Sequence, residues 1–180
     1  MTTYFPTLTL ITAPAEEPLS LSEAKLYLRV DSSDEDSVIT RMIATARQAA
    51  EHYTRRSFIT QTWTLAYDDY APAMVALPKG PVQSITSVKT IARDATETVI
   101  SSSVYTMDAG KNRLLFDADI LGLVVQITYV AGYGDASSIP EALKQGMLAH
   151  IADLYEQRPN YAGLPLTARD LYAPYRSLRL

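Results

Sequence analysis

The hydrophobic period of this 180-residue chain changes twice along its length, and that change restricts the fold more than any other feature. Apolar residues follow helical spacing up to about residue 60, mostly alternate between Gln61 and Val130, and then return to helical spacing. Helical segments on both sides of a run of strands predict an α+β fold. We therefore expect 1–60 and 131–160 to form a helical core, into which 61–130 is inserted as an antiparallel β subdomain.

Capping signals predict where the helices of the core begin. Ser20-Leu-Ser-Glu23 is a capping box, in which the serine side chain accepts a backbone hydrogen bond and the glutamate reaches back. Ser33-Asp-Glu-Asp36 places acids in a first turn, where the helix dipole favours them. Ser138-Ile-Pro-Glu141 matches a second capping box, with proline where a helix needs no N–H donor. The three main helices are expected over 21–29, 34–55 and 139–157.

Turn residues divide the middle of the chain into about five strands. Gln61–Tyr67 alternates in polarity, and Leu123–Val130 is rich in branched residues. Lys79-Gly-Pro81 and Asp108-Ala-Gly-Lys-Asn112 have the composition of turns. Strands joined by short turns predict antiparallel pairing.

The last segment combines chain breakers with many apolar and basic residues. Gly163, Pro165 and Pro174 leave room for one helical turn, opened by Thr167, so we expect an extended C-terminal arm over 161–180. Tyrosine and arginine are enriched among the residues that anchor interfaces. The arm residues expected to bind a partner are Leu171, Tyr172, Pro174, Tyr175, Arg176 and Arg179. The alternative is that the arm packs on the helices of its own chain.

Charge is unevenly distributed along this chain, whose net charge is −4. Residues 158–180 hold four arginines and one aspartate, whereas residues 16–36 hold seven acids and two basic residues. An acidic body does not suit a protein that grips the phosphate backbone of DNA. The asymmetry suits charge-complementary assembly instead.

No catalytic or metal-binding set of residues can be recognised. There are no cysteines, and His52 and His150 lie within predicted helices without ligand partners at a suitable spacing. The aspartates outside the helix starts, Asp68-Asp69 among them, follow strands, where turns favour aspartate. Val130-Ala-Gly-Tyr-Gly134 lacks the third glycine of a nucleotide-binding loop. We therefore expect no enzymatic activity, no metal and no cofactor.

The sequence shows no sign of membrane insertion or secretion. No apolar run approaches the roughly 20 residues of a membrane span. Met1-Thr-Thr-Tyr-Phe-Pro6 has no basic segment ahead of an apolar one, as a secretory signal requires. We expect no membrane partner, and a protein that acts in a cytosol or in a particle assembled there.

Short stretches at both helical ends occur in an order and spacing shared with a known family. They are Pro18-Leu-Ser-Leu-Ser-Glu-Ala-Lys25, Leu28-Arg-Val-Asp31, Asp34-Glu-Asp36, Tyr53-Thr54 with Arg56, Ile59-Thr-Gln-Thr-Trp63, Tyr129-Val-Ala-Gly-Tyr-Gly134, Pro140-Glu141, Tyr155-Glu-Gln-Arg158 and Ala173-Pro-Tyr-Arg176. In this order they resemble the head–tail connector (adaptor) proteins of long-tailed bacteriophages and prophages. The resemblance leaves Tyr67–Asp119 without a matching motif.

The resemblance implies a structural protein of the virion neck, present in the host cytoplasm during assembly. In that family many copies form a ring under the portal protein, DNA passes through without specific binding, and a head-closure or tail protein docks below. The resemblance also implies a homo-oligomeric, twelve-fold ring and a C-terminal arm that reaches the portal. The acids then expected near a subunit contact or lining the channel are Asp31, Asp34, Glu35 and Asp36. Plain capping of the helix dipole in solvent is the alternative.

Two other functions remain open on the sequence. A head-closure protein of the same neck would also bind neighbours, but we expect such a protein to be mainly β. A carbohydrate-active virion enzyme would need a pocket with paired carboxylates near Trp63, the one tryptophan of the chain. Helix content distinguishes a head-closure protein from the adaptor. The presence or absence of a pocket with paired carboxylates distinguishes a carbohydrate-active enzyme from the adaptor.

Overall fold

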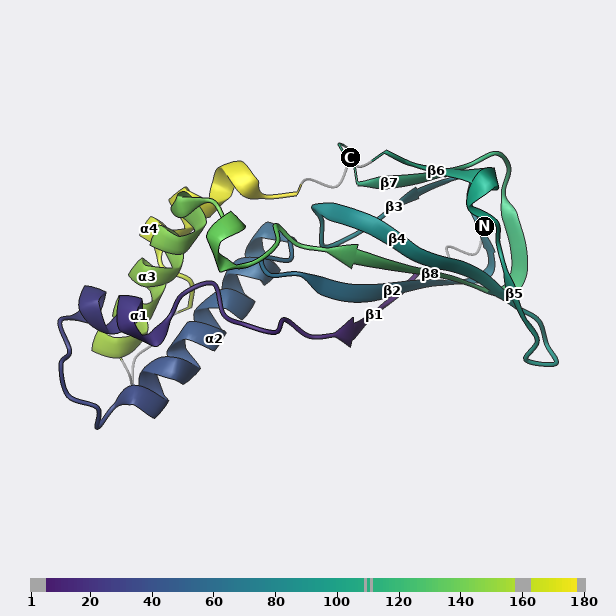
Figure 1. Cartoon of the computed structure of the whole chain (residues 1–180). Coiled ribbons are helices and arrows are strands. Elements are labelled where there is room, and N and C mark those ends of the chain that lie inside the picture. The colour runs from purple at the N-terminus through teal and green to yellow at the C-terminus, as the bar shows by residue number, and fades with distance from the viewer. Residues whose placement is uncertain (1–5, 109, 111, 158–162, 178–180) are drawn as a thin grey trace. The chain divides into compact units, whose positions relative to one another are not determined.

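The computed structural model describes residues 6–108, 110, 112–157 and 163–177, and the chain divides into two compact units (Figure 1). Met1–Pro14 and Thr60–Gly132 form a β unit, whereas Ala15–Ile59 and Tyr133–Leu180 form a helical unit. The α+β class and the antiparallel pairing expected from the sequence are confirmed.

Two antiparallel sheets make up the described part of the β unit. The larger sheet has the strand order β1-β2-β8-β4-β5, and the smaller has the order β3-β7-β6. The strands are β1 (Thr7–Thr12), β2 (Gln61–Ala71), β3 (Met74–Ala76), β4 (Val82–Ile91), β5 (Glu97–Val99), β6 (Tyr105–Asp108), β7 (Arg113–Phe116) and β8 (Ile120–Ala131), with a 3-10 turn η1 at Ser102–Val104.

Side chains from both sheets meet in one core. Along β8, every second residue from Val125 to Ala131 is buried, as the alternation of a strand requires. These residues share a core with Leu65 of β2, Val88 of β4 and Leu114 of β7. Because β8 lies between β2 and β4, its run of branched residues fills the centre of the larger sheet.

The assignment of 1–60 to the helical core needs a correction at its start. Thr7–Thr12 forms the edge strand β1 and pairs with β2, with Leu8 opposite Leu65. The segment alternates threonine and leucine, which fits a strand, but it lies far in the sequence from its partner. Its pairing therefore depends on a tertiary contact.

Four α-helices, counted over the described residues, form the helical unit. They are α1 (Leu21–Leu28), α2 (Asp36–Thr54), α3 (Glu141–Glu156) and α4 (Leu166–Tyr172), with 3-10 turns η3 at Ala136–Ser138 and η4 at Ala173–Tyr175. Apolar residues at helical spacing on α2, such as Ile39 and Ile43, share a buried core with Leu143 and Met147 of α3. α1 and α4 add Ala24, Ala168 and Tyr172 to the same core.

The first predicted capping box is confirmed and the second is wrong. Ser20 Oγ accepts a hydrogen bond from the Glu23 N–H at 3.2 Å, and Glu23 Oε2 accepts from the Ser20 N–H at 2.7 Å. The hydrogen bonds from Ser20 lower the pKa of the Glu23 carboxyl. By contrast, α3 begins after Pro140 without a side-chain cap, because Ser138 belongs to η3 and donates its N–H to Asp135 Oδ1 at 3.0 Å.

The expectation of an extended arm is wrong for its described part, residues 163–177, which carries α4 and η4. Pro165 stands at the N-cap of α4 and Pro174 lies in the first turn of η4. Neither proline removes a hydrogen bond that these turns need. The prolines therefore stand where a helical turn begins instead of preventing one.

Candidate interaction surfaces

Tyr172, expected to contact a partner, is a core residue of the helical unit. Its side chain is 0% exposed, and its ring centroid lies 6.2 Å from that of Tyr53 on α2. On α3, Gly146 leaves the space that the ring fills, because a Cβ built at Gly146 would lie 2.3 Å from Tyr172 Cε1. The missing side chain at residue 146 thus positions α4 against α3.

Hydrogen bonds fix the residues after α4 on the carboxyl end of α2. Arg56 Nε donates to the carbonyl of Tyr175 at 2.5 Å. The N–H of Ser177 donates to the carbonyl of Thr54 at 2.8 Å. Because both bonds use backbone carbonyls, this docking sets the course of the main chain as far as Ser177.

The docked segment still presents several of the expected partner-binding residues. Pro174 and Arg176 are exposed, and Leu171 and Tyr175 are half-buried. The Arg176 guanidinium carbon lies 5.4 Å from the centre of the Tyr53 ring, which is a cation–π distance. The last expected residue, Arg179, lies outside the described residues.

The four acids at the start of α2, Asp31, Asp34, Glu35 and Asp36, have different environments. Glu35 accepts a hydrogen bond from the hydroxyl of Tyr155 on α3, and Asp36 pairs with Lys25 of α1, Nζ to Oδ1 at 2.6 Å. These two acids hold the start of α2 to the neighbouring helices. Asp31 and Asp34 are exposed. The four acids therefore do not act as one set, and two of them remain available to a partner.

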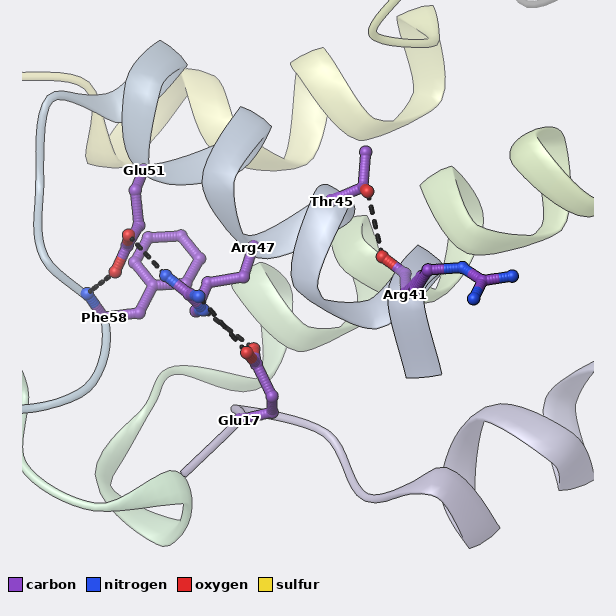
Figure 2. A network of polar contacts seen from close by, with 6 residues as sticks. All are labelled: Glu17, Arg41, Thr45, Arg47, Glu51 and Phe58. Atoms are coloured by element: carbon purple, nitrogen blue, oxygen red, sulfur yellow. Dashed lines mark hydrogen bonds and ion pairs between the residues drawn. The ribbon is translucent and has the colours of Figure 1, made fainter. Parts of the chain in front are cut away.

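Arg47 of α2 is the centre of a buried ionic network (Figure 2). It contacts Glu17, which precedes α1, through Nε–Oε2 at 2.7 Å and Nη2–Oε1 at 3.2 Å. Arg47 Nη1 also contacts Glu51 Oε2 at 3.1 Å, and Glu51 Oε1 accepts the N–H of Phe58 at 2.8 Å. Burial by itself lowers the pKa of Arg47, but the two glutamates raise it above its ordinary value. The network ties the segments entering and leaving the helical unit to α2.

A shallow depression of about 880 Å³ lies along α1. Its apolar lining comes from Leu21, Leu26 and Val30, and it is bordered by Arg29 and Asp31. Leu26 is 82% exposed. An exposed leucine beside charged groups is a feature of binding surfaces on folded domains.

The described residues hold no cluster of three or more His, Asp or Glu side chains that could bind a metal ion. His52 is exposed, whereas His150 is buried within α3. Asp69 has φ 68° at a register shift of β2, and Asp119 Oδ1 accepts the N–H of Ala73 at 2.8 Å. Asp119 lies in a loop between strands, as the sequence predicted. Asp68 and Asp69 were expected to follow a strand but lie inside β2, where the register shift marks a strand irregularity. Within the same residues, no helix is long and apolar enough to cross a bilayer.

A family model described as head completion protein matches residues 17–160. The chain belongs to this family. Its membership confirms the expectation of a structural phage protein of the head–tail junction, and it agrees with the expectation that the chain is not an enzyme. The match covers the acids ahead of α2, the Arg47 network and the depression along α1, and it ends before α4.

Solved structures share the fold of this head completion protein. A chain from the "Neck of empty GTA particle computed with C6 symmetry" matches with 24% identity and a TM-score of 0.82 over 97% of both chains. A chain from the "Virion of native gene transfer agent (GTA) particle" matches with 23% identity and a TM-score of 0.81 over 96% of both. A third, from the "Neck of native GTA particle computed with C12 symmetry", has 24% identity and a TM-score of 0.76 over 97% of both. No protein with a curated description matches the sequence.

Two features of this head completion protein were not predicted from the sequence. The spacing of Arg47 and Glu51 is that of an i, i+4 pair, which the sequence can indicate, but the contact with Glu17 requires the fold. The exposure of Leu26 runs against its apolar character, and only the packing of α1 reveals it.

Proposed function

We propose that this head completion protein forms a ring in the neck of a phage-like particle, as an adaptor between the portal and a head-closure or tail protein. The observation that carries the proposal is the fold match over 97% of the chain, with a TM-score of 0.82, to a chain from a particle neck. The sixfold and twelvefold symmetries used for the matching necks support a ring, and twelve copies is the number we expect.

The helical unit favours the adaptor over the head-closure alternative. A head-closure protein was expected to be mainly β, whereas here the helices form a unit with its own buried core. The aspartates near turns serve the backbone, which argues against the carbohydrate-active alternative. The proposed location is therefore the virion neck, with assembly in the host cytoplasm.

The portal-binding surface is proposed to be the outer side of the docked C-terminal segment. It comprises Leu171, Pro174, Tyr175 and Arg176. Arg179, which lies outside the described residues, is proposed to bind the portal as well. Tyr172 holds this surface in place from the core and does not itself touch the portal. A preformed surface loses less conformational entropy on binding than a flexible arm, so fewer anchors are needed for the same affinity.

DNA is proposed to pass through the ring without specific binding. Asp34 is exposed ahead of α2, and acids at a channel repel phosphates instead of releasing their counterions. Replacing Asp34 by lysine distinguishes channel from subunit contact. A channel position predicts salt-sensitive DNA retention with normal rings, and a contact position predicts weaker ring assembly.

The test of the adaptor role is association with the portal protein encoded beside it. We expect the folded chain to bind portal rings, and Arg176→Glu to weaken that binding by about tenfold through loss of one anchor. Arg93→Glu is the matched control, since Arg93 is also exposed but lies in the β unit. Equal binding by both variants would remove Arg176 from the surface, and no portal binding by the unaltered chain would contradict the adaptor role.

A further inference from the structure

Helix α1 has an apolar face that its own unit does not cover. Only Ala24 of this helix is fully buried, while Leu26 is 82% exposed and Tyr27 is 46% exposed. The capping box and the ion pair between Lys25 and Asp36 hold the helix in place, so this face is a fixed surface. Leu26 lines the depression together with Leu21 and Val30, whereas Tyr27 lies outside its lining.

Helix α4 has an exposed face of complementary chemistry. Leu166 is 72% exposed, and Arg169 and Asp170 are exposed three and four residues further on. Residues at these spacings lie on one side of a helix. The other side of α4 is fixed by the buried Ala168 and Tyr172. The leucine is therefore displayed one turn ahead of a base and an acid on a rigid element.

The two faces differ within one chain but match each other between two chains. The depression offers apolar lining for a leucine, with Arg29 and Asp31 on its border. An α4 seated there would place Arg169 near Asp31 and Asp170 near Arg29, which pairs opposite charges twice. Charge order of this kind fixes the orientation of a docked helix more than its affinity.

We propose that α4 of one copy docks into the α1 depression of the next copy, and that this contact closes the ring. The proposal rests on the proposed neck ring and names the surfaces that build it. Two different patches on each copy make a heterologous contact, and heterologous contacts that close produce rings. The C6 and C12 symmetries of the matching necks fit such a contact, whereas a twofold contact between identical patches would stop at a dimer.

Because the chain has no cysteines, the contact can be trapped directly. In a Leu26→Cys/Leu166→Cys chain, oxidation is expected to link neighbouring copies into a ladder that ends at the closed ring. Each single-cysteine variant is expected to give at most dimers. The matched control is Leu26→Cys/Leu121→Cys, since Leu121 is 77% exposed but lies on β8. A ladder from the control equal to that of the test pair, or no ladder from the test pair, contradicts the proposal.

Charge exchange tests the orientation of the docked helix. Arg29→Asp and Asp170→Arg should each weaken self-association by about fivefold, as expected for one exposed ion pair turned into a repulsion. In a chain carrying both changes the pair is restored with its signs reversed, so self-association should return towards the unaltered value. A double variant that assembles worse than either single variant would contradict the proposed pairing.

Mixing separates this contact from other ways of assembling. Leu26→Asp and Leu166→Asp chains should each stay monomeric but form one-to-one dimers with each other. The first variant retains the α4 face, and the second retains the α1 depression. Rings formed by either variant alone would show that the proposed contact is wrong, while leaving the neck role intact. Absence of the unaltered chain from the necks of purified particles would instead overturn the proposed function. Circular dichroism of each variant confirms that its helices are retained.

Discussion

Arg47 is the residue on which the polar interior of the helical unit depends. Arg47→Leu leaves the buried carboxylate of Glu51 and its neighbour Glu17 without their cation. We expect this variant to lower the free energy of unfolding by about 3–5 kcal/mol, the usual cost of breaking a buried ion pair on one side. Urea denaturation followed by circular dichroism measures the loss.

The control is Arg41→Leu, on the exposed side of α2, which should change the free energy of unfolding by less than about 0.5 kcal/mol. Equal losses in both variants would contradict the role given to the network.

His150 should make stability depend on pH just below neutrality. Burial lowers the pKa of His150 from its ordinary 6.5, although Asp153 opposes this shift. As pH falls through that value, the unfolded chain takes up a proton before the folded chain does, so stability decreases. Thermal unfolding between about pH 7.5 and 5.5 should show a slope that flattens in His150→Gln. The control is His52→Gln on the exposed side of α2, and a flattened slope there instead would contradict the assignment.

At the scale of elements, Gly146 sets how α4 packs on α3. In an exposed helix, Gly→Ala raises stability by about 1 kcal/mol. Here Gly146→Ala should lower stability, because the new Cβ would lie 2.3 Å from the Tyr172 ring. Adding Tyr172→Leu to this variant should recover part of the loss, since the smaller side chain leaves room for the methyl group. Differential scanning calorimetry of the single and double variants tests this, and a stabilised single variant would contradict the packing.

Removing α4 and the residues after it should damage folding as well as binding. A chain that ends at residue 162 loses the buried Ala168 and Tyr172. It also loses the hydrogen bond that Arg56 donates to the Tyr175 carbonyl and the one that the Ser177 N–H donates to the Thr54 carbonyl of α2. Burial of a tyrosine and its neighbours contributes several kcal/mol, about 3–5 for a large aromatic side chain. We expect the truncated chain to melt at lower temperature. An unchanged melting temperature would restore the view of this segment as a separate arm.

The sequence predicted those elements whose signals are local. The helices found at Leu21–Leu28, Asp36–Thr54 and Glu141–Glu156 lie close to the expected ranges, because apolar spacing and caps act within a few residues. α4 was expected only as one turn opened by Thr167, because two prolines and a glycine suggested an extended chain. Its packing depends on the space at Gly146. β1 was missed because its pairing partner is distant in the sequence. Both elements form because of tertiary contacts, which the sequence does not show.

The candidate site was predicted in outline but not in detail, for the same reason. A basic, aromatic C-terminal segment and an acidic stretch ahead of α2 are visible in the sequence. The sequence does not show which of these side chains make contacts within the fold. Tyr172 fills the core, and Asp36 pairs with Lys25, so neither can be a free anchor for a partner. The exposed face of α1 carried no sequence signal, because Leu26 fits the apolar pattern of a buried helix.

At the scale of the whole molecule, the helical unit is proposed to carry two kinds of binding surface. The side with Pro174 and Arg176 is assigned to the portal, and the α1 depression and α4 face are assigned to the next copy. Separate surfaces allow ring contacts and portal contacts to form independently. Repetition around a ring then strengthens the binding of every copy to the portal.

This chain is proposed to form a closed ring in the neck of a phage-like particle. The most direct measurement is an electron cryo-microscopy reconstruction of the particle neck, computed first without imposed symmetry. We expect a single ring of identical copies of this chain, twelve in number, below the portal, with α4 of each copy on α1 of the next. A neck without this chain, or with isolated copies that do not touch each other, would contradict it.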